Sequence, residues 1–264
     1  MCFYNGIKIS RADHIRLKDM EISLSEYDLS LLKPLQSGFD FGDWPVIRPT
    51  RDDNHAELML MHWELIPHYL RTWSDVERFR NGGLNPKTGK KDPPKNTLNA
   101  IGEEMLQKPT YRHAALNRRC LILSSFFYEW RHFTPPATKK DMAYPYKISV
   151  KDAEYFFIAG IWQPWTDQET GETIEGFSLV TTKANALMEQ VHNKKKRMPL
   201  ILTEDLAAEW ISHGLSEQRI QEITSFSFPS SQMDAYTIDK QFRVLEDPTA
   251  PFAYGELPEL IKDH

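Results

Sequence analysis

The sequence predicts an α+β fold, with a mixed, curved β-sheet or barrel at its core and helices on its flanks. Short β-rich runs outnumber helical ones, and the two kinds of segment do not alternate strictly, as they would in a parallel α/β sheet. Apolar residues make up 41% of the 264 residues, which is enough to bury a full core as one large domain or two small ones.

Five segments are rich in β-branched and aromatic residues, and their apolar residues alternate or run continuously. We expect strands at residues 57–66, 119–130, 146–150, 154–162 and 176–182. Two stretches rich in Gly, Pro and Lys, at 81–96 and 132–145, predict loops that form mobile or ligand-binding edges.

Four other segments have the spacing of apolar residues that is typical of amphipathic helices. They are residues 99–107, 184–192, 203–214 and 216–226. In the third, Thr203 suits the N-cap, because its hydroxyl can accept a hydrogen bond from the first turn. Gly214 suits the end of that helix, because glycine readily adopts left-handed backbone angles.

The composition argues against several classes of protein. No run approaches the roughly 20 apolar residues of a membrane span, and the first residues lack the apolar region of a signal peptide, so we expect a cytoplasmic protein without membrane contact. Two cysteines, Cys2 and Cys120, cannot build a disulfide framework, and no Cys or His cluster has zinc-ligand spacing. We therefore expect no metal, no cofactor and reduced thiols.

Charges are distributed unevenly along the chain. The net charge of −5 argues mildly against a nucleic-acid partner. Residues 87–140, however, carry eleven Lys and Arg against four Asp and Glu, and four consecutive cations follow at 194–197. The sequence therefore predicts a basic face on an acidic body.

Cys2 directly follows the initiator methionine. Removal of Met1 would leave an α-amine and a thiol on adjacent carbons, where an aldehyde would form an imine with the amine and the thiol would close a five-membered thiazolidine. The α-amine suits imine formation because its pKa of about 7.7–8.0 leaves more free base at pH 7 than a lysine of about 10.4. Alternatively, Cys2 is a small apolar residue of an N-terminal strand.

Such chemistry needs groups that orient the amine and move protons, and the chain offers three candidates. Glu129, within the aromatic run FFYEW, is either solvated at a rim or raised in pKa by burial. Asn99 follows a Pro-rich loop, and His192 ends a predicted helix. Each also has a purely structural interpretation. Glu129 could be a surface carboxylate on an edge strand, and Asn99 could cap a turn. His192 could interact with the dipole at the C-terminus of its helix.

Seven motifs stand in a characteristic order along the chain. They are the Met-Cys start, MHWELIP (61–67), LNA followed by Glu103, RCLILSSFFYEW (119–130), AGIW (159–162), LVTTKAN (179–185) and His192 followed by RMPLIL (197–202). Together they resemble the SRAP family (SOS response-associated peptidase-like proteins), whose members protect abasic sites in single-stranded DNA. The motifs span nearly the whole chain, so the resemblance implies a single SRAP domain over residues 1–264.

The resemblance implies that Cys2 is an N-terminal nucleophile that joins the C1′ aldehyde of an abasic deoxyribose through a thiazolidine. It further implies that Asn99 orients the α-amine or the sugar and that Glu129 assists proton transfer during ring opening and imine formation. His192 would be the acid/base that also permits reversal of the crosslink. The expected activity is lyase-like DNA–protein crosslinking, and the family is also described as autoproteolytic at its N-terminus, which would expose Cys2.

The expected partner is single-stranded DNA containing abasic sites, which calls for cations at its phosphates and flat side chains beside its bases. The residues expected to bind it are Lys194, Lys195, Lys196, Arg197, Trp130, Trp63, Tyr69 and Thr181, with Arg118 or Arg119 as further cations. The alternatives are a solvated lysine loop and tryptophans that pack in the core. We expect a monomer that associates with the nucleoid when bound to DNA.

The chain also departs from the family's pattern. Tyr4 and Ile101 stand where the family has arginines, so two DNA contacts are lost unless the lysine loop replaces them. Phe126 stands in place of a glycine and would reshape the wall of the pocket. The segment between His192 and Arg-Met-Pro is longer than in the family, and its additional residues include cations.

Two other functions are compatible with these residues. One is a cysteine peptidase that uses Cys2, His192 and Asn99 for acyl transfer, although no Gly-rich oxyanion turn adjoins Cys2. The other is a non-covalent reader of single-stranded DNA, in which Cys2 serves packing.

Overall fold

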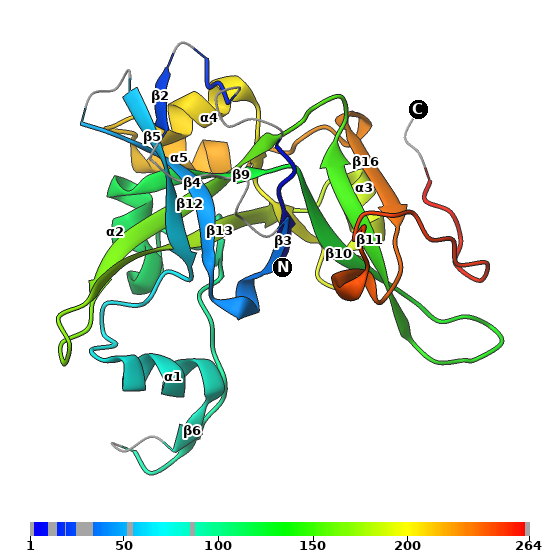
Figure 1. The fold of residues 1–264 in the computed structure, drawn as a ribbon, viewed down its shortest axis with the longest axis horizontal. Coiled ribbons are helices and arrows are strands. Elements are labelled where there is room, and N and C mark those ends of the chain that lie inside the picture. The colour runs from blue at the N-terminus through cyan, green and yellow to red at the C-terminus, as the bar shows by residue number, and fades with distance from the viewer. Residues whose placement is uncertain are drawn as a thin grey trace.

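The computed structural model describes residues 3–9, 15–18, 20–24, 34–51, 55–84 and 88–261. In this part of the chain, two large β-sheets lie side by side, and most helices cover the first of them (Figure 1). The helices are α1 (Trp73–Asn81), α2 (Pro109–Asn117), α3 (Ala186–Val191), α4 (Glu204–Ile211) and α5 (Glu217–Thr224).

The larger sheet closes into a barrel. Its strands are β2 (Glu21–Leu24), β4 (Asp43–Pro49), β5 (His55–Trp63), β8 (Asn99–Ile101), β9 (Arg119–Ser124), β12 (Phe156–Thr166), β13 (Thr173–Lys183), β14 (Arg197–Pro199) and β15 (Ile201–Leu202). Strands β5, β4, β9, β12 and β13 follow one another by antiparallel pairing. Strand β13 then pairs in parallel with β5, where Phe177 lies opposite Trp63, and this pairing closes the ring. The predicted α+β class with a curved sheet or barrel is confirmed.

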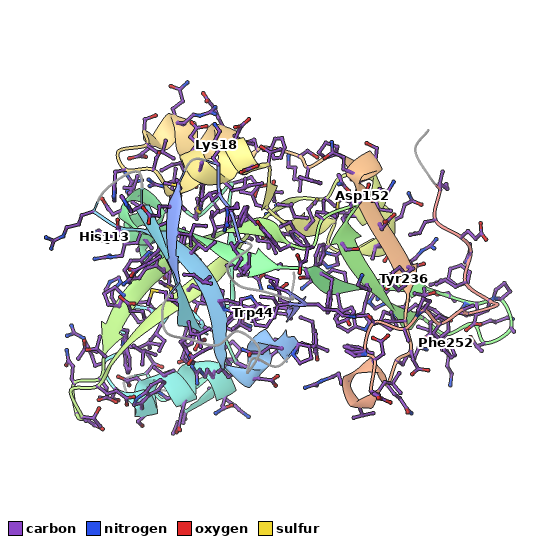
Figure 2. All side chains as sticks on the ribbon, turned by 45° about the horizontal axis from the view of Figure 1, so that its top comes forward. Lys18, Trp44, His113, Asp152, Tyr236 and Phe252 are labelled. Atoms are coloured by element: carbon purple, nitrogen blue, oxygen red, sulfur yellow. The ribbon has the colours of Figure 1, made fainter. Side chains whose placement is uncertain are left out.

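Tryptophans fill the barrel. Trp44 and Trp63 are both only 1% exposed, and Figure 2 shows Trp44 within the body of the molecule. The Trp63 ring stacks on Phe177 at 5.9 Å, and its indole Nε1 donates to the Leu98 carbonyl at 3.1 Å. Because the indole N–H finds a partner, such a large side chain can be buried without loss of a hydrogen bond.

The second sheet is antiparallel throughout. It runs in the order β16 (Met233–Thr237), β11 (Met142–Val150), β10 (Phe126–Phe133), β1 (Tyr4–Gly6) and β3 (Leu35–Ser37). The chain crosses from the barrel to this sheet at Ser125, whose N–H donates to the Gly6 carbonyl at 2.8 Å. The run predicted as one strand at 119–130 therefore forms two strands in different sheets.

Shorter elements complete the described part. The pair β6 (Gly83–Leu84) and β7 (Lys91–Asp92) forms a small hairpin that extends with α1 away from the barrel (Figure 1). Three 3₁₀ turns are η3 (Gly38–Asp40), η4 (Ser230–Gln232) and η5 (Phe242–Val244). None of the helices in the described part is long and apolar enough to cross a bilayer.

Four of the five predicted strands and three of the four predicted helices are confirmed, with ends shifted by a few residues, and the run at 119–130 is divided between β9 and β10. The helix predicted at 99–107 is wrong. Residues 99–101 form β8 and pair in parallel with β13, and turns follow. Pairing with a distant strand has overridden a helical spacing of apolar residues, as tertiary context often does.

Helix ends follow local hydrogen bonding. As predicted, Thr203 caps α4 and accepts a hydrogen bond from the Leu206 N–H. The helix ends at Ile211, and Gly214 lies in the next turn with a φ of +74°. The unpredicted helices also carry start signals, since the Thr72 side chain caps α1 and Pro109 begins α2.

Arg119 ties two helix ends to the barrel. Its guanidinium donates to the carbonyls of Ala115 and Leu116 at the end of α2, and to those of Trp210 and Ser212 at the end of α4, over 2.6–3.0 Å. These carbonyls have no partner within their own helices, so a buried cation stabilises them. Arg119 is 4% exposed and makes four hydrogen bonds to these carbonyls, so it does not offer a phosphate contact.

We predict that Arg119→Met lowers the free energy of unfolding by about 3 kcal/mol, because several buried carbonyls lose a charged donor. Urea denaturation would measure the loss. Arg118→Met, at the more exposed neighbouring residue, is the matched control and should change stability by less than about 1 kcal/mol. Equal effects of the two substitutions would show that the buried hydrogen bonds of Arg119 are not what holds the helix ends.

Candidate active site

Glu129 lies on β10, on the strand face opposite to Trp130. It is 3% exposed, and the neighbouring strand β11 places Tyr146 opposite it. On its other side, β10 pairs with β1, with Tyr4 opposite Tyr128. The first described residues of the chain therefore run beside the strand that carries Glu129.

His192 faces Glu129 from the end of α3. The imidazole Nε2 lies 3.8 Å from Glu129 Oε2. Its other ring nitrogen, Nδ1, lies 2.7 Å from the carbonyl of Arg197, an acceptor that fixes the proton on Nδ1. The lone pair on Nε2 is therefore directed to the side of Glu129.

Burial drives both groups toward their neutral forms. It raises the pKa of Glu129 to about 7, although the positive charge of Lys195 acts in the opposite direction. Burial also lowers the pKa of His192 to about 4. At neutral pH the two are thus a carboxyl group near its midpoint and a neutral imidazole, so they are a proton donor and a proton acceptor and not an ion pair.

Asn99 is the first residue of β8 and is 8% exposed. Its backbone carbonyl accepts from the Tyr111 hydroxyl at 3.3 Å, but neither polar atom of its side-chain amide has a partner among the described residues. A buried amide without hydrogen bonds costs about 1–3 kcal/mol per group. Such an amide is expected where a ligand completes the bonding.

Arg197 connects the strand of Asn99 to the loop of His192. From β14 its guanidinium donates to both carboxylate oxygens of Glu103 at 2.9 and 2.8 Å, and to the Thr181 carbonyl at 2.6 Å. Thr181 itself lies on β13, opposite Ile101 of β8 and Pro199 of β14. Arg197 and Thr181, both expected to bind DNA, thus take part in a network that holds three strands together.

The three lysines before Arg197 are exposed. Lys194 forms an ion pair with Asp141, and Lys196 lies 3.8 Å from Glu189. Lys195 makes no ion pair within the part of the chain that the structure describes, and its charge acts on both Glu129 and His192. The charge of Lys195 thus opposes the effect of burial on the pKa of Glu129 and adds to that on the pKa of His192.

The aromatic candidates lie in three different environments. Trp63 is inside the barrel, so its position fits core packing. Tyr69 is 52% exposed in the segment after β5. Trp130 is partly exposed on the far face of β10 from Glu129, where its ring lies 5.2 Å from that of Tyr4.

The sequence did not indicate Arg243, which belongs to η5. Its guanidinium carbon lies 5.4 Å from the centre of the Tyr4 ring, and Nη1 donates to the Tyr4 hydroxyl at 3.4 Å. Nη2 also lies 3.7 Å from a carboxylate oxygen of Asp40. No motif surrounds Arg243, so only the tertiary structure brings it to the residue that stands in place of a family arginine.

The two cysteines differ in what the structure describes. Cys2 lies outside the described residues. Cys120 is fully buried on β9, and burial raises the pKa of its thiol well above the usual range, so it is unsuited to act as a nucleophile. Among the described residues, no group of three or more His, Cys, Asp or Glu side chains is arranged to hold a metal ion.

The pKa values of Glu129 and His192 predict opposite effects of pH on stability. Folding raises the pKa of Glu129 from 4.5 to about 7, so its contribution to stability falls as pH rises through this window. Folding lowers the pKa of His192 from 6.5 to about 4, so its contribution falls as pH drops through that window. The two slopes oppose each other where the windows overlap.

We therefore predict that Glu129→Gln becomes more stable relative to the wild type as pH rises from 4.5 to 7, by up to about 3 kcal/mol. His192→Gln should gain relative stability as pH falls. Urea denaturation across this pH range measures both differences. A difference for Glu129→Gln that does not vary with pH would contradict the raised pKa.

The chain is similar to known proteins over most of its length. The sequence model of the family described as SOS response associated peptidase (SRAP) matches residues 39–244. Abasic site processing protein YoqW of Bacillus subtilis (strain 168) is 29% identical over 213 residues, which cover 81% of this chain and 80% of that protein. Abasic site processing protein HMCES of Xenopus tropicalis is 24% identical over 179 residues, which cover 62% of this chain and 47% of that protein.

Solved structures share the fold. An X-ray crystal structure of a protein from Bacteroides thetaiotaomicron superimposes with a TM-score of 0.76 and 30% sequence identity, covering 95% of this chain and 97% of that one. A protein from Bordetella bronchiseptica has the same fold, with a TM-score of 0.66 and 20% identity over 90% of this chain and 100% of that one. Since the family's sequence model spans well over half of the chain, the protein belongs to the SOS response associated peptidase (SRAP) family.

Proposed function

We propose that this protein processes abasic sites in single-stranded DNA, as one domain over residues 1–264, by forming a thiazolidine crosslink through Cys2 after removal of Met1. The observation that carries the proposal is the buried pair of Glu129 and His192, a proton donor and a proton acceptor 3.8 Å apart. The names of the relatives, abasic site processing proteins, support the class of substrate.

We infer from the length of the chain before Tyr4 that Cys2 can reach this pair. Cys2 precedes Tyr4 by two residues, and two residues span at most about 7 Å. Tyr4 lies opposite Tyr128, the residue before Glu129. An N-terminal amine at this distance can reach the carboxyl group.

In the proposed reaction, the α-amine of Cys2 adds to the C1′ aldehyde of the ring-opened sugar and gives a carbinolamine. Glu129 donates a proton to the departing hydroxyl, so that water leaves and a protonated imine forms. The Cys2 sulfur then bonds to the imine carbon, the electron pair of the double bond moves to nitrogen, and His192 Nε2 accepts the thiol proton. Return of this proton from His192 to Glu129 restores both groups, and the net products are the thiazolidine and one water.

Asn99 is suited to orient the reactants. Its buried side-chain amide offers a donor and an acceptor that no described residue uses. We assign the acceptor to the α-amine and the donor to a sugar hydroxyl, which would satisfy both atoms when the strand is bound. The Arg197 network fixes the strand that carries this amide.

The DNA strand would follow exposed cations and aromatic rings on the two faces of β10. Lys195 is the cation beside Glu129, with Lys194 and Lys196 on the same loop. On the other face of β10, the Tyr4 and Trp130 rings would stack with bases and Arg243 would contact a phosphate. Trp63 has no place in this surface because it is buried in the barrel.

We predict that protein lacking Met1 forms a heat-stable adduct with an abasic single-stranded oligonucleotide and that Cys2→Ala forms none. Denaturing gels and intact mass would measure adduct and processing. Cys120→Ala is the matched control, because it removes the buried thiol and should leave the adduct unchanged. An adduct with Cys2→Ala would overturn the covalent role of Cys2, and Cys2-dependent peptide turnover without an adduct would favour a peptidase.

We also predict that Arg243→Ala weakens binding to intact single-stranded DNA and reduces the slope of log affinity against log salt concentration by about 0.7, the value for loss of one phosphate contact. Arg243→Lys should retain the slope, since it keeps the charge. Arg219→Ala, on α5 and paired with Glu209 and Glu222, is the control for loss of a partly exposed arginine. Unchanged salt slopes for Arg243→Ala would remove this residue from the DNA surface.

A further inference from the structure

Asn193, the residue after His192, makes an unusual contact with β10. Its side-chain oxygen accepts from the His132 backbone N–H at 3.0 Å, and its side-chain nitrogen donates to the His132 carbonyl at 2.7 Å. One side chain thus satisfies both backbone groups of one strand residue, as the neighbouring strand of a sheet would.

The contact lies on the same edge of β10 that pairs with β1 at residues 126–128. In an antiparallel sheet, the N–H and the carbonyl of one residue point to the same side, and sides alternate from residue to residue. Tyr128 pairs with β1, and His132, four residues on, directs its backbone groups to the same side. Beyond Tyr128 this edge has no further β1 partner in the described residues, and Asn193 takes that place.

A second contact holds the same loop to the same hairpin. Asp141, at the start of β11, accepts from Lys194 and lies 3.0 Å from the His132 ring. These groups are partly exposed, and exposed ion pairs contribute little to stability. The Asn193 contact is also exposed, but it makes two hydrogen bonds to the backbone of β10 itself, whereas Asp141 lies outside that strand.

The contact joins the strand that carries Glu129 to the loop that begins beside His192. Glu129 lies on β10 itself, and His192 lies next to Asn193. On its other side, the His192 carbonyl accepts from the Lys196 N–H at 2.8 Å, and its Nδ1 is held by the Arg197 carbonyl. Without Asn193, the loop of residues 193–196 would be attached to α3 and β14 but not to the strand of Glu129.

We propose that Asn193 is a positioning residue for crosslinking, which holds His192 in register with Glu129 by pairing with the edge of β10. This inference rests on the proposed function, and the side-chain oxygen and nitrogen of Asn193 each already bond the backbone of His132. Rigid support of this kind matters because a shift of about 1 Å in a catalytic group can slow a reaction about 100-fold.

Asn193→Ala is the direct test, and Asn193→Asp is a second variant that keeps the acceptor but places a carboxylate against the His132 carbonyl. Asn193 is exposed, so neither change creates a cavity in the core. Asp141→Asn is the matched control, because it removes the Lys194 ion pair and leaves the Asn193 contact. For each variant, we would measure the rate of adduct formation between pH 5 and 9, affinity for intact single-stranded DNA and the thermal midpoint.

We expect both Asn193 variants to slow adduct formation by about 10- to 100-fold, while affinity for intact DNA stays within about twofold. Their pH profiles should lose activity at lower pH than the wild type, since a loosened loop admits water to Glu129. Asp141→Asn should keep the rate and the profile. Wild-type rates in Asn193→Ala, or a slower rate with an unchanged profile and a lowered thermal midpoint, would overturn the inference.

Titration of the His192 ring by NMR separates this inference from the proposed function. We expect the ring to titrate near 4 in the wild type and closer to 6.5 in Asn193→Ala. If the wild type forms no adduct but the titration moves as stated, the proposed crosslinking fails and the positioning role stands. An unmoved titration would overturn the positioning role.

Discussion

The desolvation of Glu129 is the constraint on which the chemistry of the site depends. Its carboxyl group is enclosed by β10 and its neighbours, so its charge is poorly solvated and its pKa rises to about 7. The same enclosure lowers the pKa of His192 to about 4. If water reached the pair, Glu129 would ionise below neutral pH and would no longer hold the proton that the proposed reaction takes from it.

This enclosed site is assembled where the two sheets meet. The buried Asn5 side chain donates to the Ser124 hydroxyl at 2.8 Å, and the Gly6 carbonyl accepts from the Ser125 N–H. Strand β1 is thus bonded to the residues at which the chain passes from the barrel to the second sheet. The start of the chain is anchored at this crossing, and Glu129 follows only four residues after Ser125 on β10.

Local signals predicted most of the elements but not how they meet. The alternation of the strand runs and the Thr203 cap are properties of neighbouring residues, so the sequence predicted them. Closure of the barrel depends on β5 and β13, which are more than a hundred residues apart, and the same kind of distant pairing turned residues 99–101 into a strand. Nothing in the local sequence reports such a pairing.

In the candidate site, too, the local sequence predicted the residues but not their partners. The FFYEW run indicated that Glu129 is either solvated or raised in pKa, and burial decides for the second. The sequence treats the cations at 194–197 alike, whereas the structure gives each different neighbours. Arg197 is bound to Glu103, Lys194 to Asp141, and the charge of Lys195 acts on Glu129. These differences depend on partners 53 and 94 residues away in the chain, which residue type alone does not reveal.

The departures from the family's pattern are accommodated by residues that are close in space and distant in sequence. Phe126, in place of a glycine, packs its ring where a side chain at Gly6 would begin, since a Cβ there would lie 1.9 Å from the ring. The ring can occupy this space only because its neighbour on β1 has no side chain. Likewise, β1 has Tyr4 where the family's pattern has an arginine. The guanidinium of Arg243, from near the other end of the chain, lies over the Tyr4 ring. A positive charge therefore lies at this surface, on a different element from the one that carries the arginine in the family's pattern.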